Sequence, residues 1–299
     1  MKNFVLIGAA GYVAPRHIQA IKETGNKLIA ALDIQDEPTV VRNYFPDARY
    51  FTSLYDLERY LTEFKAGGKS LDYITVCSPN HLHDAHVRFG LGMGADVVCE
   101  KPVVLTPAEV DALMEVEKES GKKVFTILQL RLHPAAKALK EKISRTAGNK
   151  RFRVDLQYIT ARGSSYHESW KGDINKSGGI ATNIGVHFFD LLLWVFGGVK
   201  NSRVHVHNAI TASGELELDK ADVHWLLSIE ESALPATVRS AGKQIFRTLT
   251  IDKDIFDFSE GFADLHIRSY EAILKGEGLS LSDTKAVISL VDEIRQISK

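Results

Sequence analysis

Short apolar runs alternate with amphipathic segments through the first 128 residues of the chain. The apolar runs have the length of strands and lie at residues 4–7, 27–33, 72–77, 96–99 and 123–128. Between them, apolar residues recur at helical spacing over 14–24, 53–64, 81–93 and 106–120, and Thr106-Pro107-Ala108-Glu109 predicts a capping box at the start of the last of these segments. Apolar strands that alternate with helices predict a parallel sheet that is buried under helices on both faces.

The pattern changes after Arg151 to long alternating runs that are rich in β-branched and aromatic residues. These runs lie at 152–160, 204–206, 222–230 and 245–251, and helical spacing returns at 186–196, 269–274 and 283–297. Strands grouped after a strand–helix series predict a second domain of α+β type, with a large open antiparallel sheet. We therefore predict an α/β protein with two domains, residues 1–128 and 129–299.

Charge and cysteine content narrow the classes of function. The chain has 37 basic and 38 acidic residues mixed along its length, so no basic surface for nucleic acid or membrane lipid is predicted. No run of about 18 apolar residues occurs, so no membrane-spanning helix is predicted. Cys77 and Cys99 form no closely spaced pair, which favours small buried residues in a reducing cytoplasm over a disulfide scaffold.

A glycine-containing turn follows the first apolar run. Gly8, Gly11 and Ala14 match the spacing G-x-x-G-x-x-A, a loosened form of the dinucleotide fingerprint. Glycine permits the tight turn and the close approach of a pyrophosphate, and the helix N-terminus offers free N–H groups. Tyr12 and Val13 lie in the same turn. An ordinary strand-to-helix turn is the alternative interpretation.

Asp33 makes the nucleotide interpretation the stronger one. It stands at the end of the second apolar run, about 20 residues beyond the glycines, where an acid accepts hydrogen bonds from the adenosine ribose. A carboxylate there repels a 2′-phosphate, so the sequence favours NAD over NADP. We predict an NAD-binding Rossmann domain over residues 1–128.

Further polar motifs follow the predicted strands at 72–77 and 96–99, at the carboxyl ends of parallel strands, where ligands bind in open α/β sheets. Ser78-Pro79-Asn80-His81-Leu82-His83 comes first, and Glu100-Lys101-Pro102 comes second. The second domain adds Trp170-Lys171 and the segment Asn183-Ile184-Gly185-Val186-His187-Phe188-Phe189-Asp190.

Taken in this order, the motifs resemble the glucose–fructose oxidoreductase, inositol dehydrogenase and rhizopine-catabolism family over essentially the whole chain. The resemblance implies that Lys101 and His187 flank the reacting carbon. One departure concerns the aspartate that the family usually has four residues before this histidine, because Asn183 stands there.

A narrower branch, the UDP-N-acetylglucosaminuronate 3-dehydrogenases, has asparagine at that position. The chain resembles this branch at Gly8–Tyr12, Ala14–His17, Leu128–Arg131, Ser169–Asp173, Ala181–Phe188 and Glu260-Gly261-Phe262. The resemblance implies oxidation of the C3 hydroxyl of UDP-N-acetylglucosaminuronate to the 3-keto sugar, in lipopolysaccharide O-antigen synthesis. It also leaves open whether 2-oxoglutarate reoxidises NADH that stays bound.

The expected roles of the residues follow from this chemistry. Histidine is the usual base near neutral pH, so His187 is predicted to take the hydroxyl proton while Lys101 stabilises the developing alkoxide. Asn183, Arg16, Arg131 and Lys171 are predicted substrate contacts, besides Lys101 and His187; Arg162 is a further available cation. The predicted cofactor contacts are Gly8, Gly11, Tyr12, Val13, Asp33, Ser78, Asn80, His83, Glu100, Lys101, Gln129 and Trp170, with Glu100 and Gln129 placed beside the nicotinamide by resemblance.

Alternative functions remain at this point. An inositol or free-sugar dehydrogenase of the same family would use the same residues, and a non-catalytic NAD-responsive binding protein would need neither Lys101 nor His187. His81, His83 and His86 look like a metal cluster, but no acid or cysteine completes the set and no metal is expected. By resemblance, a homodimer or homotetramer is expected, since an open sheet would otherwise leave a large apolar patch in water.

Overall fold

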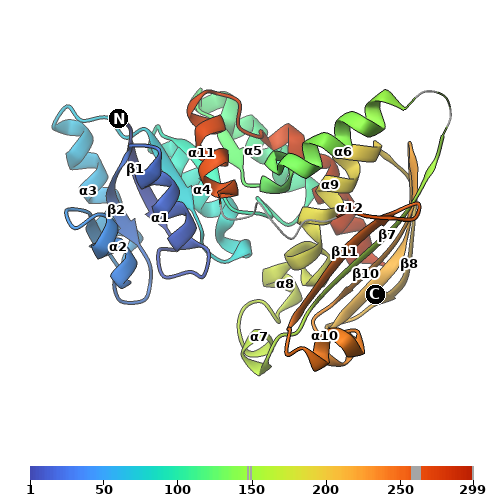
Figure 1. Cartoon of the computed structure of the whole chain (residues 1–299). Helices are drawn as coiled ribbons and strands as arrows, with labels where there is room; N and C mark the ends of the chain where they lie inside the picture. The colour runs from blue at the N-terminus through green and yellow to red at the C-terminus, as the bar shows by residue number, and fades with distance from the viewer. Residues whose placement is uncertain (147, 149, 257–263, 298–299) are drawn as a thin grey trace. The chain divides into compact units, whose positions relative to one another are not determined.

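The computed structural model describes residues 1–146, 148, 150–256 and 264–297, so Glu260, Gly261 and Phe262 lie outside the described residues. The chain divides into two compact units (Figure 1). The first comprises Met1–Leu128 and Ala263–Thr284, and the second comprises Gln129–Phe262 and Lys285–Lys299. The chain thus returns to the first unit near its end, which the sequence pattern did not indicate.

The first unit contains a six-stranded parallel sheet in the order β3-β2-β1-β4-β5-β6. The carboxyl ends of its strands carry the predicted nucleotide loop and the motifs that follow the runs at 72–77 and 96–99. The strands are β1 (Asn3–Ile7), β2 (Lys27–Leu32), β3 (Arg49–Phe51), β4 (Tyr73–Val76), β5 (Asp96–Cys99) and β6 (Val124–Thr126).

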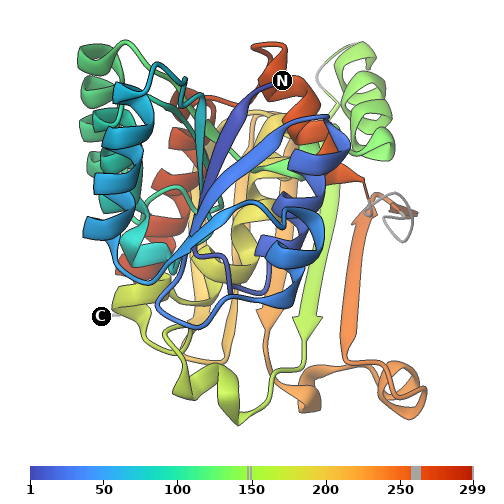
Figure 2. The same cartoon turned by 90° about the vertical axis from the view of Figure 1, so that its left-hand side faces the viewer.

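Helices cover both faces of this sheet, as the alternating pattern predicts (Figure 2). One face carries α1 (Ala14–Glu23), α2 (Thr39–Tyr44) and α11 (Leu265–Leu274), and the other carries α3 (Leu54–Ala66), α4 (His83–Gly92) and α5 (Pro107–Ser120). A short turn, η1 (Asn80–Leu82), precedes α4. The capping box predicted at Thr106 and Glu109 is confirmed: each caps the other's backbone N–H at the start of α5.

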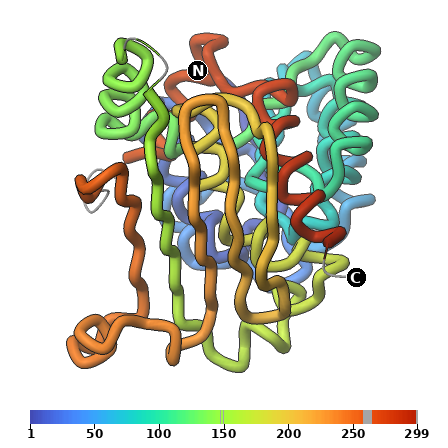
Figure 3. The backbone as a smooth tube through the Cα atoms, turned by 90° about the vertical axis from the view of Figure 1, so that its right-hand side faces the viewer, coloured from blue at the N-terminus to red at the C-terminus, as the bar shows by residue number. Residues whose placement is uncertain are grey.

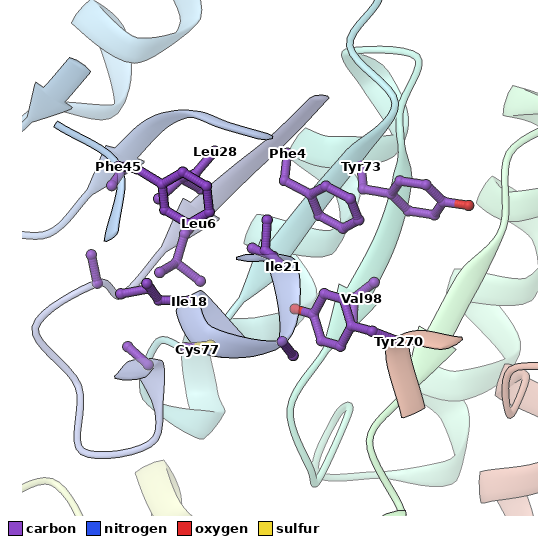
Figure 4. Packing of buried hydrophobic residues seen from close by; sticks show 14 of the residues in the cluster. Phe4, Leu6, Ile18, Ile21, Leu28, Phe45, Tyr73, Cys77, Val98 and Tyr270 are labelled. Carbon is purple, nitrogen blue, oxygen red and sulfur yellow. The ribbon is translucent and has the colours of Figure 1, made fainter. Parts of the chain in front are cut away.

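The core of the first unit lies between the sheet and the layer that holds α1 and α11 (Figure 4). Phe4 stacks on Tyr73, and Tyr270 from α11 packs against Phe4 with ring centroids 5.7 Å apart. Tyr270 is fully buried although it comes from the far end of the chain. The end of the sequence therefore completes the core that its beginning builds.

The second unit contains another six-stranded sheet, in the order β12-β11-β7-β10-β9-β8 (Figure 3). The predicted open sheet is confirmed, and it is mixed: β7 and β10 pair in parallel, whereas the other neighbours are antiparallel. The strands are β7 (Phe152–Thr160), β8 (Val199–His207), β9 (Thr211–Leu218), β10 (Ala221–Ser228), β11 (Ile245–Ile251) and β12 (Asp254–Phe256).

Helical segments pack on one face of this sheet, where Phe189 of α9 meets Trp225 edge-on and Phe188 meets Tyr158. The helical segments of this part of the chain are η2 (Gln129–Leu132), α6 (Pro134–Arg145), α7 (Ser164–Glu168), α8 (Ile174–Ser177), η3 (Ala181–Gly185), α9 (Val186–Phe196), η4 (Glu231–Ala233), α10 (Ala236–Ser240) and α12 (Leu281–Gln296), the last divided between the two units.

One stretch of this unit, Ile174–Phe196, is long and apolar enough to cross a membrane by length and composition alone. Of its most apolar window, 72% is buried inside the structure, and its residues include the buried Asp190. Since the core helix of a folded domain passes the same test, packing against the sheet accounts for its composition.

The other face of the second sheet carries a polar cluster. Glu215 lies 3.3 Å from His205 and 3.6 Å from His224, and these three side chains are 45–50% exposed. On the neighbouring strands, Arg153 of β7 stands opposite Asp222 of β10 in the register of the sheet. Val206 of β8 is 41% exposed, so apolar side chains also lie on the exposed strands. The apolar patch and the subunit pairing expected from it stay predictions.

Candidate active site

The glycine turn lies directly against the end of β4. Gly8 has a φ of +86°, and a Cβ atom built there would lie 2.5 Å from the backbone nitrogen of Ser78. The N–H groups of Gly8 and Ala9 both donate to the carbonyl of Leu32, at 2.8 and 3.1 Å. Glycine is thus required both for the left-handed backbone and for the close contact.

Asp33 holds the same turn from the end of β2. Its Oδ2 accepts the N–H of Ala10 at 2.9 Å, and its Oδ1 accepts the N–H of Gln35 at 3.1 Å. In the part of the chain that the structure describes, the N–H groups of Tyr12 and Val13 have no acceptor, and α1 begins just after them. Free N–H groups at a helix N-terminus fit a diphosphate, so this loop fits the predicted dinucleotide.

The motif after β4 is fixed by histidines. The ring of His83 is 1% exposed, with Nδ1 2.6 Å from the carbonyl of Pro102 and Nε2 2.8 Å from the carbonyl of Ser78. His86 Nδ1 lies 2.8 Å from Ser78 Oγ, and burial lowers the pKa of His86 to about 4. His83 thus ties the loop after β4 to the loop after β5 from beneath the surface. Its predicted contact with the cofactor stays a prediction.

Glu100 points into the protein. It is 6% exposed, and its Oε1 lies 2.9 Å from His17 Nε2 and 3.2 Å from His266 Nε2. Its Oε2 accepts the N–H of Lys101 at 3.2 Å. Burial alone would raise the pKa of Glu100, but its hydrogen bonds with His17 and His266 outweigh burial and hold the pKa well below its usual range. The position beside the nicotinamide, expected from the resemblance, stays a prediction that these inward contacts do not favour.

A π-helical turn carries the site residues of the second unit. Asn183 lies in this turn, η3, and His187 follows in the first turn of α9, so the two share one side of the helical segment. Gly185 between them lets the turn approach the sheet, because a Cβ there would lie 2.6 Å from Leu227 Cδ1. The amide of Asn183 donates to Tyr166 Oη at 2.8 Å. Both site residues are half-buried.

Arg131 is held in an ion pair within the second unit. Its Nε and Nη2 reach the two carboxylate oxygens of Asp190 at 2.9 and 2.5 Å, and the side chains are 12% and 1% exposed. This bidentate pair joins η2 to α9, one helical turn from His187. The guanidinium of Arg131 binds Asp190 through two hydrogen bonds. The predicted contact of Arg131 with substrate stays a prediction.

The predicted cations lie in different settings. Arg16 is exposed on α1 in the first unit, whereas Lys171 is half-buried in the second, with its Nζ 5.8 Å from the centre of the Trp170 ring. Burial and the charge of Arg162 lower the pKa of Lys171. Among the described residues, no acid lies within ion-pair distance of Arg162 or Lys171. Two neighbouring cations without an acid suit an anionic ligand.

Gln129 adds a polar group without a partner. Its side-chain Oε1 is buried and has no hydrogen-bond partner among the described residues. A buried amide oxygen in this state fits a ligand group that donates a hydrogen bond.

The sequence also missed three groups that shape these sites, His17, Tyr166 and His266. His266 had no signal at all, since it stands 166 residues from its partner Glu100.

The chain matches two family models. Residues 2–128 match the oxidoreductase family with an NAD-binding Rossmann fold, and residues 150–237 match the C-terminal alpha/beta domain of the same oxidoreductase family. The chain belongs to this family. Its residues 2–128 match the NAD-binding Rossmann fold of that family, as the sequence predicted.

Among solved structures, the chain is similar to the WlbA (WbpB) dehydrogenase of Thermus thermophilus. The identity is 44%, over 99% of this chain and 96% of that one, with a TM-score of 0.95 for its complex with NAD and alpha-ketoglutarate. A second structure of that protein, in complex with NAD and UDP-GlcNAcA, gives a TM-score of 0.94.

Curated relatives are more distant. The oxidoreductase YteT of Bacillus subtilis is 27% identical over 66% of this chain and 47% of its own length. The D-glucoside 3-dehydrogenase of Escherichia coli is 26% identical over 46% of this chain and 39% of its own length. The chain thus spans less than half of the length of each of these two relatives.

Proposed function

We propose that the protein oxidises the C3 hydroxyl of UDP-N-acetylglucosaminuronic acid to the 3-keto sugar with NAD as the oxidant. The observation that carries this proposal is the 44% identity, over 99% of the chain, to a dehydrogenase whose structure holds NAD and UDP-GlcNAcA. The chain's own residues supply what the reaction needs: a diphosphate loop in the first unit, and Asn183 and His187 on one helical side in the second.

The chemistry divides among three side chains. His187 takes the proton of the C3 hydroxyl, as a neutral imidazole can near pH 7. Lys101 stabilises the negative charge that develops on the same oxygen, and Asn183 orients a neighbouring hydroxyl. NAD, when bound, accepts the hydride from C3, so the carbon is oxidised to a ketone and the nicotinamide is reduced.

The anionic groups of the substrate need cations. Lys171 and Arg162 are neighbouring positive charges, and Lys171 is half-buried beside Trp170. A carboxylate or a diphosphate bound there would remove their mutual repulsion. We assign these two residues to the anionic part of the nucleotide sugar, with Arg16 as a further candidate in the first unit.

Three further features complete the proposal. Reoxidation of bound NADH by 2-oxoglutarate fits the alpha-ketoglutarate complex of the Thermus thermophilus protein. The two free, buried cysteines suit a reducing compartment, so we place the reaction in the cytoplasm, within lipopolysaccharide O-antigen sugar synthesis. We further propose a homodimer or homotetramer, which light scattering would test.

The test is a product assay with the purified full chain. The protein is mixed with UDP-N-acetylglucosaminuronic acid and NAD, with or without 2-oxoglutarate, and the sugar is analysed by mass spectrometry. A UDP-sugar lighter by two hydrogens supports the proposal, and turnover only with 2-oxoglutarate supports recycling. Free sugars, D-glucosides and myo-inositol are the matched alternatives, and a product from one of them in place of the UDP-sugar would overturn the substrate assignment.

A further inference from the structure

We propose that His17, Glu100 and His266 form a buried positioning unit that holds the backbone of Lys101 in place for the reaction. The inference rests on the proposed catalytic role of Lys101, but its structural part can be tested separately. Glu100 immediately precedes Lys101 and accepts its N–H, so any movement of the carboxylate moves the residue that carries the catalytic amine.

A row of hydrogen bonds joins β4 to this positioning unit. Thr75 Oγ1 lies 2.9 Å from Tyr270 Oη, which in turn lies 2.9 Å from His17 Nδ1. If Thr75 donates to Tyr270 and Tyr270 donates to Nδ1, His17 is the neutral tautomer with its proton on Nε2, which then donates to Glu100. Burial lowers the pKa of His17, in agreement with a neutral ring. Every member then has a partner and the assignment is self-consistent.

The geometry fits the carboxylate form of Glu100. With the proton of each ring on Nε2, both imidazoles donate to Oε1 while the N–H of Lys101 donates to Oε2, so both oxygens act as acceptors. A protonated carboxyl would place a donor against one of these donors. A buried carboxylate without such partners would be costly, so the histidines are what makes a negative charge tolerable at 6% exposure.

Three separate elements meet at this carboxylate. His17 comes from α1, just after the nucleotide loop, and Glu100 follows β5. His266 comes from α11, which reaches the first unit from the end of the chain. The rings of His17 and His266 also touch edge-on, with centroids 5.0 Å apart. The positioning unit therefore links the proposed cofactor loop to the segment that carries Lys101.

The same three residues could ligate a metal ion, since their donor atoms lie within 4.8 Å of one another. The hydrogen-bonded arrangement favours positioning, because each Nε2 proton already has the carboxylate as its acceptor. Metal analysis of the purified protein separates the two interpretations. Zinc or another transition metal at one equivalent, lost in Glu100→Gln, would overturn the proposal.

The experiment measures amide hydrogen exchange in the full-length protein, with turnover and NAD affinity beside it. Glu100→Gln removes the charge, and His17→Leu removes one donor, whereas His17→Gln retains an N–H near the position of Nε2. Thr75→Val is the matched control, since it removes the hydroxyl at the outer end of the row of hydrogen bonds and leaves the contact between Tyr270 and His17 in place.

We expect the Lys101 amide to exchange faster in Glu100→Gln and His17→Leu, with kcat lower by about 10²-fold and the Kd for NAD within about threefold of the unmodified protein. His17→Gln should keep most of the protection of the Lys101 amide against exchange and most of the kcat. Exchange that rises equally in β7, or a kcat that falls only with the folded fraction, would show a merely structural role and overturn the proposal. If the UDP-sugar is not a substrate at all, the exchange at Lys101 still decides the structural part.

Discussion

The two units hold their functional groups in opposite ways. In the first unit, Gly8, Asp33 and Glu100 are built into the backbone or the core, and each makes contacts that the fold itself needs. In the second unit, Asn183 and His187 are half-buried on one side of a helical segment whose packing is provided by other residues. The difference teaches that function and stability should separate on substitution in the second unit but not in the first.

The strongest test of this separation is His187→Asn. We expect kcat to fall by about 10²–10⁴-fold, because the base is lost, while the thermal midpoint stays nearly unchanged. NAD affinity, measured by calorimetry, should also be retained. His167→Asn is the matched control on the exposed part of α7. Near-normal turnover in His187→Asn would remove this residue from the mechanism.

In the first unit, Gly8→Ala should damage binding and folding together. The added methyl group would lie 2.5 Å from Ser78 N on a backbone with φ of +86°. Gly25→Ala is its control, since Gly25 has φ of +72° and no atom within 4 Å of the added Cβ. We expect about 1–2 kcal/mol of destabilisation from the left-handed backbone in the control, and a larger loss together with weaker NAD binding in Gly8→Ala. Equal effects of the two substitutions would argue against the close contact.

Asp190→Asn sharpens the comparison inside the second unit. It leaves the guanidinium of Arg131 without its buried carboxylate, so we expect about 3 kcal/mol of destabilisation in chemical denaturation. The double variant Arg131→Met/Asp190→Leu should recover most of that loss, because no unpaired charge remains. If the double variant is as unstable as Asp190→Asn, the ion pair is not the origin of the effect.

The smallest expected effect is a dependence of stability on pH in the first unit. Burial lowers the pKa of His86 from 6.5 to about 4, so the unfolded chain binds a proton that the folded chain does not. Stability should therefore fall as the pH drops from about 6.5 towards about 4. His86→Asn keeps a group that can form a hydrogen bond with Ser78. The thermal midpoint of this variant should therefore depend less on pH between about 6.5 and about 4. An unchanged slope would show that other groups dominate.

The sequence predicted the elements whose pattern is local. The strands and helices of the first 128 residues were found, except for the short α2 and β3, and the capping box at Thr106 was located to the residue. In the second part, the helices α6, α7, α8 and α10 and the strands β9 and β12 were missed. Glycine and charged residues in β9, such as Gly214 and Glu215, hide its alternation, although it lies inside the sheet.

What the sequence could not predict depends on contacts between distant residues. Nothing in the pattern indicates that α11 joins the first sheet, or that His17 and His266 meet at Glu100. The bond between Arg131 and Asp190 is of the same kind, because a cation near a proposed site resembles a substrate ligand until its partner is known. Motifs identified which residues matter, and the fold decided what several of them contact.

The central claim is that hydride leaves C3 of the nucleotide sugar and passes to the cofactor. The most direct measurement is a single turnover with UDP-N-acetylglucosaminuronic acid that carries deuterium at C3, followed by analysis of the nicotinamide. We predict deuterium at the nicotinamide C4 of NADH and a 3-keto sugar free of it. Deuterium retained in the sugar, or lost only to water, would contradict the proposed reaction.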